Sequence, residues 1–84
     1  MIVKVTRKDI RHGEPDSTDS CPIALALRRM SFEWCQVQNS YWSYYNNRNR
    51  APLPKKAKEF IKAFDQEKPV SPFSFRTVNL KKAV

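Results

Sequence analysis

The sequence predicts a small α+β protein, in which two helices pack on a small antiparallel sheet. Short segments of alternating β-branched or aromatic residues lie at both ends and in the middle of the chain, two amphipathic segments lie between them, and 84 residues suffice for one domain. The elements follow the order β-α-β-β-α-β, which the ferredoxin-like fold shares. A different α+β sheet order is the alternative, because order along the chain does not fix strand pairing.

The first strand is predicted at residues 1–6, where valines alternate with polar residues. Thr6 and Asp9 fit a capping box loosely, which predicts a helical turn over residues 7–11. Gly13, the one glycine of the chain, is expected to end this turn in a left-handed conformation.

A central helix is expected from Ser20 to Met30. Ser20 is the expected N-cap, and Pro22 suits the first helical position. At about 100° per residue, the apolar face contains Ile23, Ala26, Leu27 and Met30, with Ala24 at its edge. Leu25 lies off this face together with Cys21 and the two arginines, so this side is either covered by another element or forms a contact surface.

Residues 32–38 and 41–45 predict a β-hairpin, with its turn at Asn39–Ser40. Residues 46–50 are rich in asparagine and arginine and contain no apolar anchor. They predict a mobile basic loop, the best candidate for a flexible flap.

A second helix is predicted from Pro54 to about Gln66, because apolar residues recur there at i, i+3, i+4 and i+7. Its lysines occupy the first turns, which is the opposite of what the helix dipole favours. They indicate either an anion site at the start of the helix or a solvated lysine face. Residues 73–78 then predict the last strand.

Residues 1–84 are expected to form a single domain, with a frayed basic tail from about residue 79. So small a domain is marginally stable alone, which favours a homo-oligomer. Two cysteines and the absence of a signal peptide favour a reducing cytoplasm. The longest apolar run, residues 23–27, is too short to cross a membrane.

Catalysis and metal binding are not indicated. A single glycine rules out glycine-rich phosphate loops, and His12, Cys21 and Cys35 have no metal-ligand spacing. A reactive Cys21 would need His12 as its base, so a half-buried structural cysteine is the preferred interpretation. We therefore expect a non-enzymatic protein without a metal or cofactor.

The net charge of +8 lies in the middle and the C-terminal part, because residues 1–20 sum to zero, 21–50 to +3 and 51–84 to +5. This favours an anionic partner, although it also serves solubility. Aromatic residues between basic ones suit base stacking, but the third strand lacks the signature of the RNA-recognition motif. The candidate ligand-binding residues are Arg28, Arg29, Trp42, Tyr44, Arg48, Arg50, Lys55 and Lys58.

Three segments carry a resemblance to known proteins: Cys21–Leu27 (CPIALAL), residues 60–65 (FIKAFD) and residues 69–75 (PVSPFSF). Together they resemble short uncharacterised proteins encoded by bacteriophages and prophages. The resemblance transfers no functional residue. It implies an accessory protein of host takeover or counter-defence, which acts in the host bacterial cytoplasm by binding and blocking a host component.

Three functions are compatible with these observations. The leading hypothesis is a phage protein that sequesters an anionic ligand, with a nucleotide-type host signal slightly preferred. The first alternative is a nucleic-acid-binding protein that uses the same residues. The second is an inhibitor that blocks a host defence or transcription protein by direct contact, through Leu25, Cys21 and the hairpin aromatics.

Overall fold

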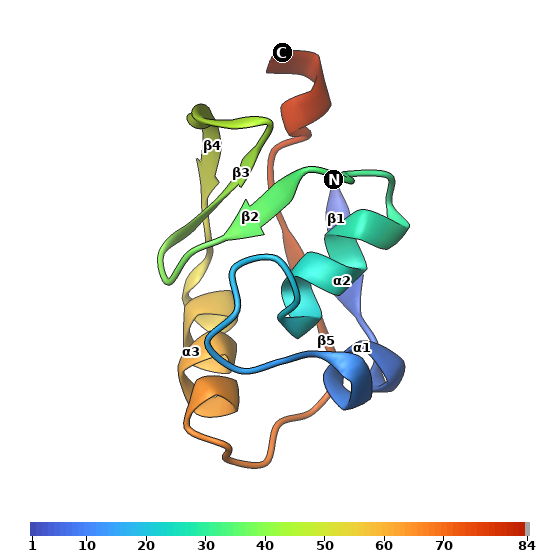
Figure 1. Ribbon diagram of the computed structural model, residues 1–84, viewed down its shortest axis with the longest axis vertical. Helices are drawn as coiled ribbons and strands as arrows, with labels where there is room; N and C mark the ends of the chain where they lie inside the picture. The colour runs from blue at the N-terminus through green and yellow to red at the C-terminus, as the bar shows by residue number, and fades with distance from the viewer. Residues whose placement is uncertain (84) are drawn as a thin grey trace.

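The computed structural model describes residues 1–83 and contains two antiparallel sheets and three helices within that range (Figure 1). In chain order the elements are β1 (Ile2–Val5), α1 (Arg7–His12), α2 (Pro22–Arg29), β2 (Cys35–Val37), β3 (Tyr41–Tyr44), β4 (Asn46–Pro52), α3 (Lys55–Asp65), β5 (Phe73–Arg76) and the 3₁₀ turn η1 (Leu80–Ala83). The predicted α+β class is confirmed. The ferredoxin-like arrangement is not, because β1 pairs with β5 alone, while β2, β3 and β4 form a separate meander.

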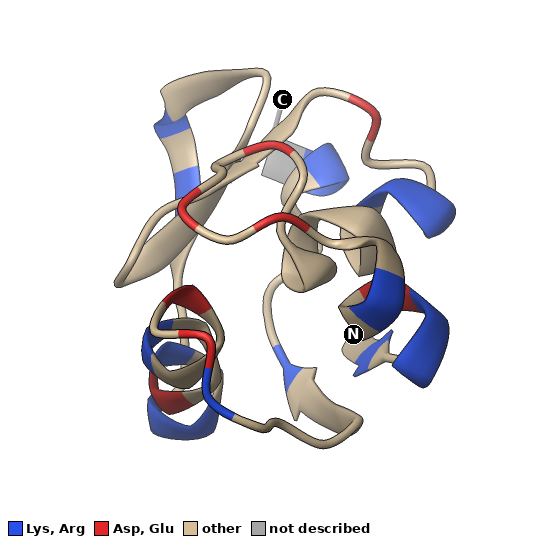
Figure 2. Ribbon diagram, turned by 60° about the horizontal axis from the view of Figure 1, so that its bottom comes forward, with Lys and Arg blue, Asp and Glu red and all other residues tan. Residues whose placement is uncertain are grey.

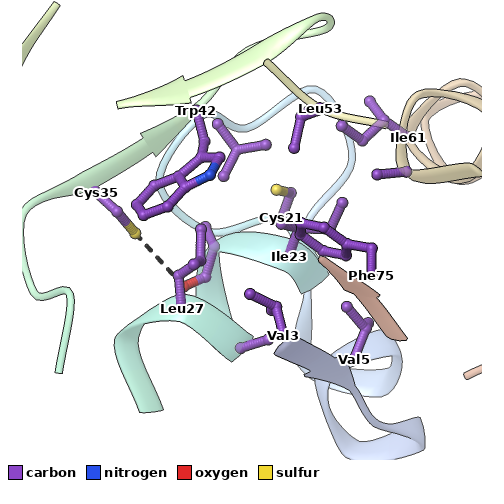
Figure 3. Packing of buried hydrophobic residues seen from close by; sticks show 14 of the residues in the cluster. Val3, Val5, Cys21, Ile23, Leu27, Cys35, Trp42, Leu53, Ile61 and Phe75 are labelled. Atoms are coloured by element: carbon purple, nitrogen blue, oxygen red, sulfur yellow. Dashed lines mark hydrogen bonds between the residues drawn. The ribbon is translucent and has the colours of Figure 1, made fainter. Parts of the chain in front are cut away.

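The core lies between the inner faces of the two sheets, with α2 packed inside it. Figure 3 shows Ile23 and Leu27 of α2 between Val3 of β1, Phe75 of β5 and Trp42 of β3. The predicted alternation of the first and last strands is confirmed, since the valines of β1 and Phe75 point into this core. Both sheets thus cover one cluster of buried side chains.

The start of α1 follows the predicted capping box. The Thr6 hydroxyl accepts a hydrogen bond from the Asp9 N–H at 3.2 Å, and the Asp9 carboxylate accepts one from the Thr6 N–H at 2.9 Å. The expected left-handed Gly13 is wrong, because its φ is −72°. Glycine is needed here for space instead: a Cβ atom at Gly13 would lie 2.6 Å from the Pro22 ring.

The expected N-cap of α2 is also wrong by one residue. Cys21 is the N-cap and makes no capping bond through its side chain, while the Ser20 hydroxyl lies 3.4 Å from the Asp19 carboxylate. Cys21 precedes the helix in an extended conformation, so helical spacing does not place its side chain. It is only 5% exposed and belongs to the core rather than to the outer side of α2. Leu25 is half-buried.

The predicted mobile loop at residues 46–50 is wrong, because these residues belong to strand β4. Asn46 and Arg50 pair with β3, and residues 47–49 form an irregular part of the ladder between them. Tyr45 turns the chain between the two strands with a φ of 74°. The Asn46 side chain then accepts a hydrogen bond from the Arg48 N–H at 2.9 Å. The apolar anchor of the strand is Ala51, which is small but buried.

The C-terminal segment is held to the body, which contradicts the expectation of a frayed tail. Leu80 is buried, and its carbonyl accepts a hydrogen bond from the Asn49 side chain at 3.0 Å. The Lys81 ammonium donates to the Met30 carbonyl at 3.1 Å and lies 4.6 Å from the centre of the Phe32 ring. Contacts with η1 thus fix the free side of β4.

The predicted second helix is confirmed as α3. It buries Ala57, Phe60 and Ile61, and the Phe60 ring lies 4.7 Å from the Phe73 ring of the last strand. No side chain caps its start at Pro54.

Candidate nucleic-acid interface

The outer face of the β2–β3–β4 sheet is the best candidate for a binding surface. Trp42, Cys35 and Ala51 fill the inner face, so strand alternation turns Tyr41 and Arg50 to the opposite side. Arg48 is exposed and lies two residues before Arg50, in the part of β4 where the pairing with β3 is irregular. Figure 2 shows the basic positions of β4 in blue.

The central contact of this face joins an arginine to an aromatic ring. The Arg50 guanidinium carbon lies 4.8 Å from the centre of the Tyr41 ring, within the range of a cation–π interaction. The ion pairs of residues 1–83 involve other cations, so Arg50 keeps its donors free of any carboxylate. An arginine that is oriented by a ring but not neutralised is suited to bind phosphate.

Two further aromatic side chains lie at one end of the same sheet. Trp34 is 65% exposed and Tyr45 is 61% exposed. Their backbones meet, because the Tyr45 N–H donates to the Trp34 carbonyl at 3.4 Å. Tyr45 also packs edge-on against Tyr44 at 5.0 Å, and Tyr44 packs in the same way against the buried Phe32. Contacts with the core therefore orient an exposed ring. We use the name basic-aromatic face for Tyr41, Arg48 and Arg50 together with the exposed rings of Trp34 and Tyr45 at the end of the same sheet.

The sequence-predicted aromatic candidates lie elsewhere. Trp42 has an exposed fraction of 0%, and its indole N–H donates to the Thr77 hydroxyl at 2.8 Å. It is therefore not available to stack on a ligand. Tyr44 is half-buried and acts as the support of Tyr45.

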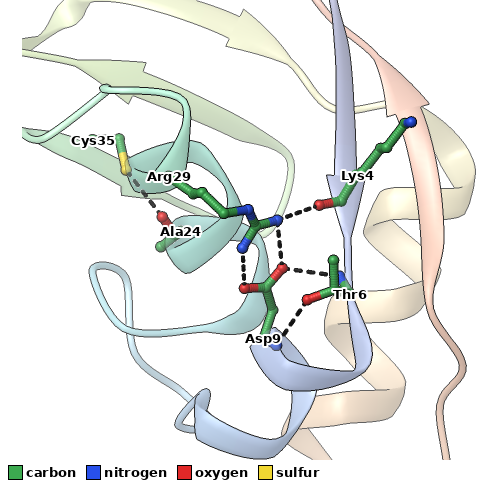
Figure 4. Close-up of polar contacts among 6 residues, drawn as sticks. All are labelled: Lys4, Thr6, Asp9, Ala24, Arg29 and Cys35. Atoms are coloured by element: carbon green, nitrogen blue, oxygen red, sulfur yellow. Dashed lines mark hydrogen bonds and ion pairs between the residues drawn. The ribbon is translucent and has the colours of Figure 1, made fainter.

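The two arginines of α2 make contacts within the protein. The Arg29 guanidinium donates to both oxygens of Asp9, at 2.6 and 3.0 Å, and to the Lys4 carbonyl at 2.8 Å (Figure 4). The Arg28 guanidinium donates to the carbonyls of Asp19 and Glu33. The charge of Arg29 is therefore neutralised by Asp9, whereas Arg28 donates only to uncharged carbonyl groups.

The Arg29 contact changes the acidity of its partner. Burial alone would raise the pKa of Asp9, but the hydrogen bonds from Arg29 and Thr6 and the charge of Arg29 outweigh burial and lower this pKa. Arg29 therefore stabilises the junction of α1 and α2.

The lysines at the start of α3 form a separate region. Lys55 lies 3.9 Å from Glu59, one turn further along the helix. Lys58 lines a hollow of about 330 Å³ with Asn39 and Ile61. Arg48 and Arg50 thus lie on the same strand, β4, whereas the α2 and α3 candidates lie at other sites.

Neither cysteine has the features of a nucleophile. Burial raises the pKa of the Cys21 thiol, and it raises the pKa of the Cys35 thiol to about 11. The Cys35 thiol lies 3.7 Å from the Ala24 carbonyl in the core.

Sequence reasoning missed Trp34, Tyr41 and Tyr45 as site residues, although the signal was present. Once Trp42 is assigned to the core, strand alternation turns Tyr41 outward. Trp34 and Tyr45 were placed inside the predicted hairpin strands, whereas both lie just outside the observed strands β2 and β3 and are exposed.

The comparisons with known proteins give no family for this chain: no protein-family model, curated protein or solved structure matches it. Among residues 1–83, no helix has the length and apolar character needed to cross a membrane. Over the same residues, histidine, cysteine and acidic side chains form no group of three that could hold a metal ion.

Proposed function

We propose that this protein is a non-enzymatic binding protein that holds single-stranded nucleic acid on the basic-aromatic face. Two observations carry this proposal: the Arg50–Tyr41 pair on the outer face of the sheet, and the exposed rings of Trp34 and Tyr45 at the end where β2 begins and β3 ends. Single-strand binders combine cations that follow the phosphates with aromatic rings on which bases stack. Arg48 and Arg50 supply the cations in this proposal.

An open surface favours a strand over a small captured ligand. A nucleotide in a pocket needs its phosphate and base contacts around one cavity. Lys58 and Arg29 line two different hollows, and the basic-aromatic face is an exposed sheet surface. Sequestration of a nucleotide signal therefore has less support than binding of a strand.

Direct blocking of a host protein through the outer side of α2 also has less support. Cys21 is in the core and Leu25 is half-buried, so they do not form an exposed apolar patch. The phage setting and the homo-oligomer remain predictions that accompany the proposal. In that setting the bound strand would come from the phage or from its host.

Tryptophan fluorescence tests the proposal directly, because one tryptophan is exposed and the other is buried. Titration with a twelve-nucleotide oligo-dT should quench the emission of Trp34 and leave that of Trp42 unchanged. In the variant Trp34→Phe the quenching should disappear, and an anisotropy titration with labelled oligo-dT should still detect binding. A mononucleotide that binds as tightly as the oligonucleotide would contradict strand binding and support sequestration.

A further inference from the structure

The outer edge of β5 is an open strand edge. In the β1–β5 ladder, Met1 and Thr77 exchange two hydrogen bonds, at 2.8 and 3.0 Å. Main-chain groups alternate along an antiparallel strand, so those of Phe73 and Phe75 also face β1, and those of Ser74 and Arg76 point to the other edge. Within residues 1–83, these outward groups have no hydrogen-bond partner.

The same alternation gives this edge a particular surface. Ser74 and Arg76 turn their side chains to the solvent face, as do Ile2 and Lys4 of β1. Lys4 and Arg76 take part in none of the ion pairs of residues 1–83. Figure 4 shows the Lys4 side chain directed away from the Arg29–Asp9 pair, which engages only its carbonyl.

Exposed aliphatic side chains lie beside these charges. Ile2 is 49% exposed and pairs with Arg76 across the ladder, and Val78, two residues further along the chain, is 59% exposed. An exposed sheet edge is a common acceptor for an added strand. Both outer edges of the β1–β5 sheet lack a neighbouring strand, but at the edge of β1 the Lys4 carbonyl already accepts a hydrogen bond from Arg29. The surface thus combines free main-chain groups, two cations and two aliphatic side chains.

We infer that an extended acidic segment of a partner protein binds here as a third strand beside β5. Its main chain would pair with Ser74 and Arg76, and its carboxylates would lie on the solvent face, where they would meet Lys4 and Arg76. Its apolar residues would lie on the opposite face of the added strand. This surface is separate from the basic-aromatic face, which belongs to the other sheet. The inference does not depend on nucleic-acid binding.

Charge complementarity selects this occupant over two others. A second copy of the chain would bring another Arg76 and a further net charge of +8 to the same edge, and charged edge residues oppose such self-pairing. Nucleic acid lacks the peptide groups that complete a strand ladder. The exposed apolar residues of this surface are also aliphatic, whereas bases stack on aromatic rings.

The test uses the full chain and a labelled ten-residue peptide of alternating valine and glutamate. Fluorescence anisotropy should detect binding, and hydrogen exchange should slow at the amides of Ser74 and Arg76. A peptide of the same sequence, N-methylated throughout its interior, keeps the charge but cannot form a ladder. It should bind about tenfold more weakly or worse, because the ladder hydrogen bonds are lost.

Two variants locate the site. Ser74→Pro removes an outward N–H without removing a hydrogen bond to β1, so it should abolish peptide binding while circular dichroism reports a folded protein. Arg76→Glu should weaken binding about tenfold, whereas Lys68→Glu, an equal charge change at an exposed residue away from β5, should change it less than about twofold.

Three results would overturn the inference. Equal binding of the N-methylated peptide would mean that charge alone holds the peptide. Competition of oligo-dT with the peptide for the same amides would assign the edge to nucleic acid. If, without peptide, hydrogen exchange at the amides of Ser74 and Arg76 slows as the protein concentration rises, the β5 edge would be assigned to a second copy of the chain. The comparison of the two peptides uses the unmodified protein, so it decides the matter even if Ser74→Pro does not fold.

Discussion

The indole nitrogen of Trp42 lies 2.8 Å from the Thr77 hydroxyl and donates a hydrogen bond to it. Trp42 belongs to β3 of the meander, and Thr77 directly follows β5 of the two-stranded sheet. This bond joins two sheets that do not share a strand ladder. It also fixes the inward direction of Trp42 and hence the outward direction of Tyr41 on the basic-aromatic face.

Removal of the Thr77 hydroxyl should destabilise the protein. Thr77→Val leaves the buried indole N–H without its partner, and we expect a loss of about 1–3 kcal/mol in the free energy of unfolding. Trp42→Phe removes the donor as well as volume from the core. Urea unfolding of both variants and of the double variant should give a coupling of about 0.5–1.5 kcal/mol. If the destabilisation of the double variant equals the sum of the two single-variant values, the hydrogen bond contributes no stability.

Stability should fall in acid because of Asp9. Its pKa is lower in the folded protein than the ordinary value of 3.8, since the Arg29 and Thr6 contacts outweigh burial. The folded state is therefore stabilised above pH 3.8, and this stabilisation is lost as the pH falls through the lowered pKa. Urea unfolding at a series of pH values should show this slope, and Asp9→Asn should reduce it. An unchanged slope in Asp9→Asn would assign acid sensitivity to other groups.

Gly13→Ala should destabilise the protein through a steric clash. The added Cβ would lie 2.6 Å from the Pro22 ring and 2.8 Å from the Pro22 nitrogen, so either the α1–α2 connection or the start of α2 must move. We expect a loss of about 1–3 kcal/mol in thermal or urea unfolding. Pro22→Ala removes the ring atoms and should recover part of this loss in the double variant. Equal stability of Gly13→Ala and the wild type would show that the connection adapts freely.

Both cysteines should react slowly with iodoacetamide at pH 8. Cys21 and Cys35 are buried, and burial raises the pKa of both thiols, to about 11 for Cys35. Mass spectrometry should therefore find little alkylation in the folded protein and rapid alkylation in urea. Fast modification of Cys21 in the folded state would contradict its structural role.

Local patterns predicted most of the elements because their signals are local. The Thr6–Asp9 box, the apolar spacing of α3 and the alternation of Val3 and Val5 each depend on a few neighbouring residues. The division into two sheets could not be predicted in this way. It depends on which strands pair, and on the contact between Trp42 and a residue 35 positions away.

The candidate site was predicted only in part, for physical reasons. Arg48 and Arg50, predicted to bind a ligand, are exposed, but the strand that holds them was hidden by the small apolar anchor Ala51. The pairing of Arg29 with Asp9 spans 20 residues, so composition alone gave Arg29 the appearance of a free cation.

The measurement that tests the central claim most directly is the salt-dependent affinity of oligo-dT for two matched double variants. Arg48→Glu/Arg50→Glu changes the basic-aromatic face, and Lys55→Glu/Lys58→Glu changes the start of α3 by the same charge. The account predicts that the arginine variant loses about 100-fold or more in affinity at moderate salt and flattens the salt dependence, while the lysine variant loses less than about tenfold. The opposite order, or equal losses in the two variants, would contradict binding on the basic-aromatic face.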